Sequence, residues 1–228
     1  MATHAGRPEI RIEAFHVADF VQPAESPLAG ETGIVMAYAV VHPHGVLLFD
    51  TGIGVGSPEI DASFRPVVRD LTDMLQARGI AADEVVALAN SHLHFDHCGQ
   101  NAAFPDRPIH VQAVEYEAAQ AKDYTVAGWV AFPGAQYERH AGDVELLPGV
   151  RLVPTPGHTP GHQSMLIDAA GGRTAIVGQA LFMRAEWLGS DHRSVSGLDS
   201  AWDRERYRSS VARLRAFGPD VVLFGHDR

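Results

Sequence analysis

Four potential metal ligands are packed into one six-residue motif, H-x-H-x-D-H, formed by His92, His94, Asp96 and His97. The motif follows a short apolar run at 84–89 that predicts a buried strand. In extended geometry His92 and His94 project to the same side, so both imidazoles can meet one cation. Asp96 and His97, in the turn that follows, can face a neighbouring position. The spacing therefore allows two adjacent metal sites.

Two later segments place further histidines directly after predicted strands. The segment 155–162 reads TPGHTPGH and contains His158 and His162, and the segment 224–227 reads FGHD and contains His226. These segments favour a metal centre over the alternative that the H-x-H-x-D-H motif is a solvated polar turn. Imidazole and carboxylate are good zinc ligands, and zinc lowers the pKa of a bound water towards about 7. Such a centre supplies hydroxide at neutral pH.

Composition restricts the class of protein. The 228 residues are 46% hydrophobic and 20% charged, which predicts one globular domain over residues 1–228. No apolar run approaches the roughly 18 residues of a membrane span, and no secretory signal is visible, so we expect a cytoplasmic protein without membrane contact. A net charge of −10 argues against nucleic-acid binding. We expect a small-molecule substrate, and the sequence does not indicate the oligomeric state.

The single cysteine, Cys98, excludes an internal disulfide and predicts a small buried apolar side chain.

The strands and helices that position these motifs can be predicted from short β-branched runs and from residues that end helices. We predict strands at 10–15, 34–41, 46–49, 84–89, 108–112, 144–147, 150–154, 164–168, 174–177 and 221–224. Helices are predicted at 66–78, 113–121 and 203–217, a loop or lid at 124–140, and a loop at 183–200. Two sheet-rich halves of similar length suit a sandwich of two packed sheets.

Together the motifs resemble the metallo-β-lactamase superfamily over almost the whole chain. The resemblance rests on Asp50-Thr51-Gly52 after an early strand, the H-x-H-x-D-H block, the TPGHTPGH segment and the late Gly-His. It implies an α/β fold, the αββα sandwich of two mixed β-sheets flanked by helices, with metals in a cleft at one sheet edge.

The resemblance also implies a role for each ligand. His92, His94 and His158 would hold a first zinc ion, and Asp96, His97 and His226 a second. Asp96 would in addition pass a proton from the attacking hydroxide to the leaving group. Asp50 would orient a ligand histidine without touching the metal. The resemblance gives His162 no ligand role, and His16, His42, His44, His110, His140 and His192 are interpreted as surface or structural histidines.

One position departs from the family pattern at the metals. The family supplies a bridging aspartate after a strand like that at 174–177, where this chain has Gly178-Gln179. Glutamine is neutral, so the repulsion between two dications is less well offset. The second zinc then binds more weakly, or the working site holds one metal, or Gln179 is itself an alteration; the sequence leaves these open.

The amino-acid sequence around the motifs most resembles that of the N-acyl homoserine lactonase branch. The implied reaction is lactone ring opening by metal-bound hydroxide, with Asp96 assisting the departing alkoxide. Phe182 stands where those lactonases have a tyrosine, and it cannot donate a hydrogen bond. Trp129, Phe132 and Phe182 are candidates for an apolar substrate pocket, with core or lid packing as the alternative. Hydrolysis of another small ester, a cyclic amide or a phosphodiester, a mononuclear iron dioxygenase, and a catalytically silent binding relative stay open.

Overall fold

The computed structural model describes residues 7–26, 28–189 and 201–228. Its strands are β1 (Arg11–Val21), β2 (Thr32–His42), β3 (Gly45–Phe49), β4 (Val67–Val68), β5 (Val85–Ala89), β6 (Pro108–Gln112), β7 (Gln136–His140), β8 (Val144–Leu147), β9 (Val150–Pro154), β10 (Gln163–Ala169), β11 (Gly172–Ile176) and β12 (Val221–Leu223). Its helices are α1 (Pro58–Phe64), α2 (Leu71–Ala77), α3 (Phe95–Cys98), α4 (Ala113–Ala118), α5 (Ala127–Val130), α6 (Arg184–Leu188) and α7 (Arg204–Phe217), with 3-10 turns η1 (Ala82–Glu84) and η2 (Asn101–Ala103).

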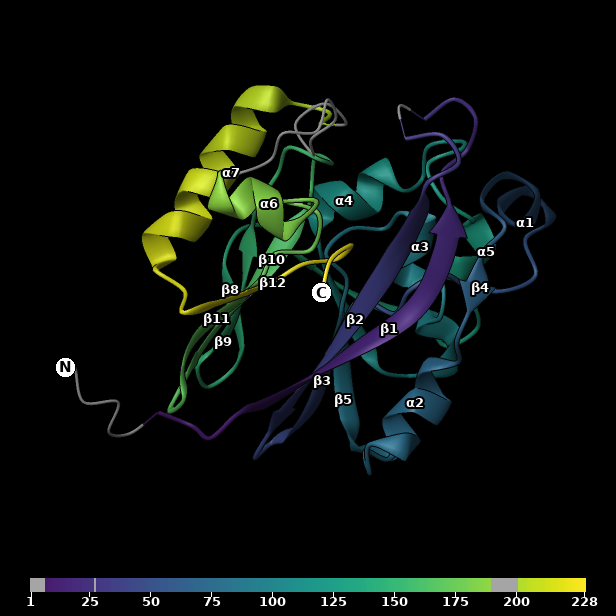
Figure 1. The fold of residues 1–228 in the computed structure, drawn as a ribbon. Helices are drawn as coiled ribbons and strands as arrows, with labels where there is room; N and C mark the ends of the chain where they lie inside the picture. Colours follow the sequence, from purple (N-terminus) through teal and green to yellow (C-terminus); the bar gives the residue numbers. More distant parts are fainter. Residues whose placement is uncertain (1–6, 27, 190–200) are drawn as a thin grey trace.

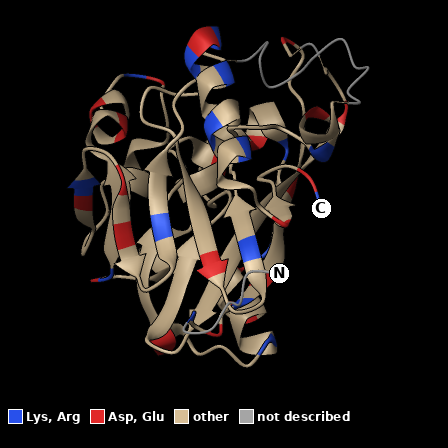
Figure 2. Ribbon diagram, turned by 90° about the vertical axis from the view of Figure 1, so that its left-hand side faces the viewer, with Lys and Arg blue, Asp and Glu red and all other residues tan. Residues whose placement is uncertain are grey.

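The strands form two mixed sheets that pack face to face. The larger has the order β4-β1-β2-β3-β5-β6-β7 and the smaller β12-β11-β10-β9-β8. Helix α7 covers the outer face of the smaller sheet and α2 lies against the larger one (Figure 1). Most of the length of the strands is uncharged (Figure 2). The predicted αββα sandwich of two mixed sheets is confirmed.

Strand β2 shows how one sequence serves two apolar layers. Ala37 and Ala39 belong to the core between the larger sheet and its helices. Tyr38 and Val40 belong to the core between the two sheets. Successive side chains of a strand point to opposite faces, so a continuous apolar run fits a strand that is buried on both sides.

The C-terminal helix agrees with its prediction because both of its ends are encoded locally. The side chain of Asp203 accepts hydrogen bonds from the N–H groups of Glu205 and Arg206, and Gly218 ends the helix at φ 64°. A capping acid and a left-handed glycine are the usual signals for helix ends. Within the described residues, no helix combines the length and apolar character needed to cross a membrane.

The prediction for 66–78 was wrong at its start. Val67–Val68 instead pairs with β1 as strand β4, and the helix begins after Asp70, whose side chain accepts from the N–H groups of Thr72 and Asp73. The segment before it contains α1, where no helix was predicted. Ser57 caps α1 and Pro58 occupies its first turn, which is a favourable combination at a helix start.

Two predicted loops contain regular structure. The segment 124–140 includes α5 and the edge strand β7, whose pairing with β6 is parallel. The segment 183–200 includes α6; its remainder, 190–200 with His192, lies outside the described residues. The first strand is longer than predicted and has an irregular register between His16 and Ala18. The predicted helix at 113–121 is shorter, at Ala113–Ala118.

Candidate metal centre

Three histidine side chains converge where strands of both sheets end. His92 and His94 follow β5 in the larger sheet, and His158 follows β9 in the smaller one. Nδ1 of His94 lies 3.0 Å from Nε2 of His92 and 3.2 Å from Nε2 of His158. These three nitrogens lie within 4.8 Å of one another, so a single ion can contact all three. The structure thus brings together the three residues predicted for a first metal.

A second group of ligand atoms lies beside the first. Oδ2 of Asp96 lies 3.5 Å from Nε2 of His97 and 3.5 Å from Nε2 of His226. Asp96 and His97 lie on α3, and His226 follows β12 at the other end of the chain. His92, Asp96 and His97 also have ligand atoms within 4.8 Å of one another, so the two groups are contiguous.

In the second group, each histidine uses Nδ1 for a hydrogen bond and keeps Nε2 for a metal. Nδ1 of His97 contacts Oδ2 of Asp50, and Nδ1 of His226 contacts the carbonyl of Ile34. Nε2 of each ring is buried without a hydrogen-bond partner. Buried polar nitrogens rarely lack a partner, and metal-ligating histidines commonly anchor their other ring nitrogen in this way. The residues therefore fit a metal ion.

The pKa shifts of the clustered histidines also favour a metal site. Burial, reinforced by neighbouring imidazoles, holds the pKa of His92 and of His158 well below the usual value and lowers that of His94 to about 4. These rings are neutral near pH 7, with lone pairs available to a metal. Burial also opposes charge on His97, but Asp96 and Asp50 outweigh it and raise the pKa of His97 to about 9. A positive charge is thus favoured between the two carboxylates.

Asp50 is placed as a support for the motif. It follows β3 with φ 60°, a left-handed conformation that aspartate tolerates better than most residues. Its side chain accepts from the backbone N–H of Ser91 at 2.6 Å and from Oγ of Ser91 at 2.8 Å. Together with the contact to His97, these bonds fix the beginning of the motif.

His162 is close to the cluster, but both of its ring nitrogens have partners. Nδ1 lies 2.9 Å from Oγ1 of Thr155, and Nε2 accepts the backbone N–H of Gln179 at 3.0 Å. The ring therefore positions the turn after β11. In that turn Gly178 has φ 57°, and a Cβ there would lie 2.6 Å from Cβ of Ser91. Only glycine fits such a close approach without displacement.

Gln179 lies at the edge of the second group. Its side chain is one of the groups that raise the pKa of His97, after the two carboxylates. Its Oε1 is buried without a hydrogen-bond partner. A neutral amide oxygen thus stands at the position where the family resemblance implies a bridging aspartate.

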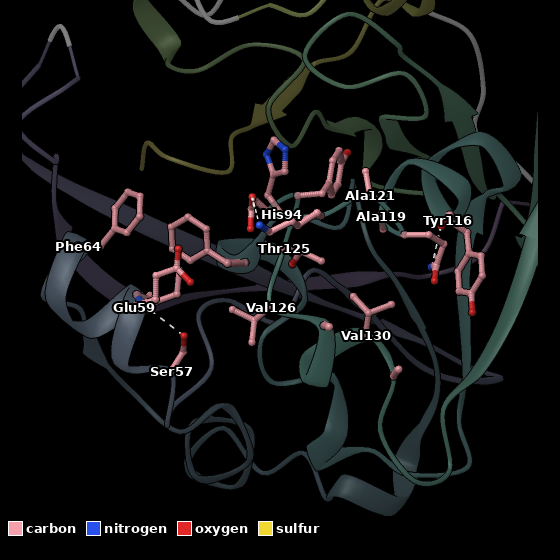
Figure 3. Close-up of a pocket in the computed structure, with 18 residues that line it drawn as sticks. Ser57, Glu59, Phe64, His94, Tyr116, Ala119, Ala121, Thr125, Val126 and Val130 are labelled. Atoms are coloured by element: carbon pink, nitrogen blue, oxygen red, sulfur yellow. Dashed lines mark hydrogen bonds and ion pairs between the residues drawn. The ribbon is translucent and has the colours of Figure 1, made fainter.

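A cavity of about 720 Å³ opens beside His94. Its apolar lining comes from α1, α3, α4, α5 and the segments around them, and includes Ile60, Phe64, Phe95, Tyr116, Val126 and Val130. Figure 3 shows His94, Phe64, Val126 and Val130 around this space. A cavity with apolar side chains on its wall that reaches a histidine of the first candidate ligand group is suited to a substrate with a hydrocarbon portion.

The three aromatic residues predicted for the pocket are not among the described residues that line this cavity. Trp129 and Phe132 pack against the core on the outer face of the larger sheet, and neither is among the described residues that line the cavity. Phe182 stacks on the His226 ring with centroids 4.8 Å apart, and it lines a second cavity of about 230 Å³. Phe182 is thus beside the second group of ligands.

Sequence reasoning missed Glu115. This residue lies on α4, is only 1% exposed, and contacts the segments that carry His94 and His158. No local signal marks it, because an acid early in a helix is usually solvated. Its helix follows β6, the neighbour of β5 in the sheet, which was the only indication that it would lie near the motif.

Comparisons with known proteins agree with this geometry. The family model described as the metallo-beta-lactamase superfamily matches residues 30–226. An N-acyl homoserine lactonase of Bacillus cereus is 33% identical over 211 residues, which cover 91% of this chain and 79% of the relative. N-acyl homoserine lactonase AiiA of Bacillus thuringiensis subsp. kurstaki is 31% identical over 209 residues, covering 85% and 81% of the two chains. The crystal structure of a B. thuringiensis AiiA mutant with N-decanoyl-L-homoserine at its active site superimposes with a TM-score of 0.79 at 25% identity, covering 97% and 94%.

Proposed function

Because the chain belongs to the metallo-beta-lactamase superfamily, we propose that it is a zinc-dependent hydrolase that opens the lactone ring of an N-acyl homoserine lactone. The observation that carries this proposal is the pair of contiguous ligand groups, with two histidine Nε2 atoms buried, unpartnered and facing Asp96. The relatives named as lactonases support the choice of substrate class.

We assign the two groups to two zinc ions. His92, His94 and His158 hold the first ion, and Asp96, His97 and His226 hold the second. When bound, zinc lowers the pKa of a water ligand towards about 7 and polarises an ester carbonyl. Neutral imidazoles at His92, His94 and His158 are ready to bind without losing a proton, because burial depresses their pKa values.

Asp96 has a second task in this proposal. Neighbouring histidines lower its pKa despite the opposing effect of burial, so its carboxylate is ionised near pH 7. It can therefore accept a proton from the attacking water and deliver it to the alkoxide that leaves when the ring opens. Because Asp96 belongs to the second ligand group and its ligand atom also lies within 4.8 Å of that of His92, it would be close to a lactone carbonyl held at the metals.

The acyl chain fits the cavity beside His94. That cavity of about 720 Å³ is lined mainly by apolar side chains and begins at the first ligand group. The lactone carbonyl can then lie at the metals while the hydrocarbon chain replaces water along Phe64, Val126 and Val130. Phe182 faces the other side, against His226, where it offers an apolar ring surface and no hydroxyl.

The experiment that tests the proposal combines metal analysis with substrate hydrolysis. Purified protein is analysed for zinc, iron and manganese per chain, and a panel of N-acyl homoserine lactones, simple esters and a phosphodiester is assayed. We expect zinc at more than one equivalent, or one tight and one weak equivalent, together with ring opening. Iron with oxygen uptake would instead indicate a dioxygenase. Tight metal without turnover of any substrate would indicate a silent binding relative.

A further inference from the structure

Glu115 joins three chain segments through one buried carboxylate. Oε1 accepts the backbone N–H of Leu93 at 2.9 Å and the hydroxyl of Tyr124 at 2.5 Å. Oε2 accepts the hydroxyl of Thr159 at 2.7 Å and the backbone N–H of Gly161 at 3.1 Å. Four donors therefore surround a side chain that is almost fully buried.

The partners of Glu115 are the immediate neighbours of metal-ligand candidates. Leu93 stands between His92 and His94 in the sequence, and Thr159 follows His158 directly. These two segments come from different sheets and are separated by more than sixty residues, so neither fixes the other locally. The carboxylate is the common acceptor that ties one to the other.

Close packing reinforces this connection. A Cβ at Gly161 would lie 2.3 Å from the backbone nitrogen of Glu115, so the turn after His158 contacts the start of α4 directly. The hydroxyl of Tyr124 completes the set, and the Tyr124 ring packs on His94 with centroids 4.8 Å apart. One side chain thus restrains the backbone on both sides of the first ligand group and the ring that lies over it.

We propose that Glu115 is a positioning residue that holds the His92–His94 segment and the His158 turn at the separation needed to bind the first metal ion. This inference rests on the proposed metal-dependent function. Glu115 is not a ligand, because both of its oxygens are occupied by donors of the protein. It acts through the backbone, by limiting how far the three histidine nitrogens can separate when no ion holds them together.

The first test is Glu115→Gln, which retains the size of the side chain. A glutamine has one acceptor oxygen and an NH₂ group, so the NH₂ faces two donors that it cannot satisfy. We expect the affinity for the more tightly bound zinc equivalent, measured by competition with a chromophoric chelator, to fall about tenfold or more. The absorption spectrum of the cobalt-loaded variant should also change, because it reports coordination geometry.

A matched control separates positioning from general loss of stability. Leu75→Ala opens a hole under α2, on the outer face of the larger sheet, where Leu75 is fully buried. It should lower the melting temperature and leave zinc affinity and the cobalt spectrum as in the unaltered protein. If Glu115→Gln weakens zinc no more than Leu75→Ala does, Glu115 has no positioning role.

A second pair of variants decides the question if Glu115→Gln does not fold. Thr159→Val removes one donor to the carboxylate, whereas Thr159→Ser retains the hydroxyl. We expect weaker zinc binding in Thr159→Val and recovery in Thr159→Ser; equal affinities in the two would overturn the proposal. Absence of metal binding in the unaltered protein would contradict the proposed function itself. If the unaltered protein binds metal and opens lactones, and the Glu115 and Thr159 variants bind zinc as tightly as it does, only the proposed role of Glu115 is contradicted.

Discussion

Oδ2 of Asp50 lies 2.9 Å from Nδ1 of His97, and this contact decides which nitrogen of His97 carries a proton. A carboxylate can only accept, so Nδ1 keeps its proton, and Nε2, towards Asp96, is the nitrogen that gives up its proton to a metal. The remaining capacity of Asp50 is used by Ser91, which fixes the carboxylate itself. A residue outside the ligand set thus determines whether His97 can bind a metal.

Asp50→Asn should therefore impair the second ligand group. With one amide oxygen retained for Ser91, the NH₂ group faces Nδ1 of His97 and favours the opposite tautomer, in which Nε2 carries the proton. We expect about 10- to 100-fold weaker binding of the second zinc equivalent and a similar loss of kcat/KM. Chelator competition and steady-state lactone hydrolysis measure these quantities. Unchanged affinity for both equivalents would show that Asp50 does not set the tautomer.

Gln179→Asp should strengthen the second metal site. A carboxylate in place of the unpartnered amide oxygen adds a negative charge beside His97, where it offsets the repulsion between two dications. We expect the weaker zinc equivalent to bind at least about tenfold more tightly, a gain of ~1.4 kcal/mol. Zinc titration followed by calorimetry provides the measurement.

Gln179→Asn is the matched control for that substitution, because asparagine has the shape of aspartate without its charge. It should leave the weaker equivalent as weak as before or weaker. If Gln179→Asn and Gln179→Asp tighten binding equally, side-chain length rather than charge limits the second site.

Ala127→Phe should alter the preference for acyl chain length. Ala127 is exposed at the start of α5 and lines the cavity beside His94, so a phenyl group there occupies space without disturbing the core. We expect KM for a long-chain lactone to rise about tenfold, since several methylene groups lose burial at ~0.8 kcal/mol each, while KM for a short-chain lactone changes little. Ala82→Phe, an exposed position on η1 that is not among the described residues lining this cavity, is the control. An equal effect on both chain lengths would place the acyl chain elsewhere.

Local signals in the sequence were enough for the ligand motif and for the elements with marked ends. His92, His94, Asp96 and His97 lie within six residues of one another, so their proximity does not depend on the rest of the fold. The helix at 203–217 carries its own cap and terminating glycine. By contrast, β7 is an edge strand with little burial, and its polar sequence lacks the apolar alternation that identifies strands.

Long-range contacts account for what could not be predicted. Trp129 and Phe132 have aromatic side chains of the kind that line substrate pockets, but both are partly buried against the core beside the larger sheet, and this packing depends on residues distant in sequence. Glu115 gains its importance from Leu93 and Thr159, which are distant in sequence, and no pattern around Glu115 reveals those partners. The same applies to Phe182, whose stacking on His226 joins residues more than forty positions apart.

Removal of metal should lower thermal stability. The two ligand groups draw together three chain segments from both sheets, and an ion that binds only the folded chain stabilises it by ~2.7 kcal/mol at a hundredfold excess over Kd. For a chain of this length we expect a fall of roughly 5–10 °C in melting temperature after chelation, restored by added zinc. Scanning calorimetry with and without chelator gives the result. A melting temperature that is insensitive to chelator and zinc would indicate that no ion couples these segments.

The stacked pair His110 and His140, outside the ligand groups, should contribute to acid sensitivity. Nδ1 of His110 lies 2.9 Å from Nε2 of His140, and burial together with the neighbouring ring lowers the pKa of His110 to about 4. The unfolded chain takes up this proton below about pH 6.5, while the folded chain resists it until about pH 4. The free energy of unfolding therefore decreases progressively as pH falls through that window, by at most ~1.4 kcal/mol per pH unit.

His110→Gln should flatten the decline in the free energy of unfolding between pH 6.5 and 4.5, measured by urea titration with metal removed from both proteins. Parallel pH profiles for the variant and the unaltered protein would show that His110 is protonated equally easily in the folded and unfolded chains.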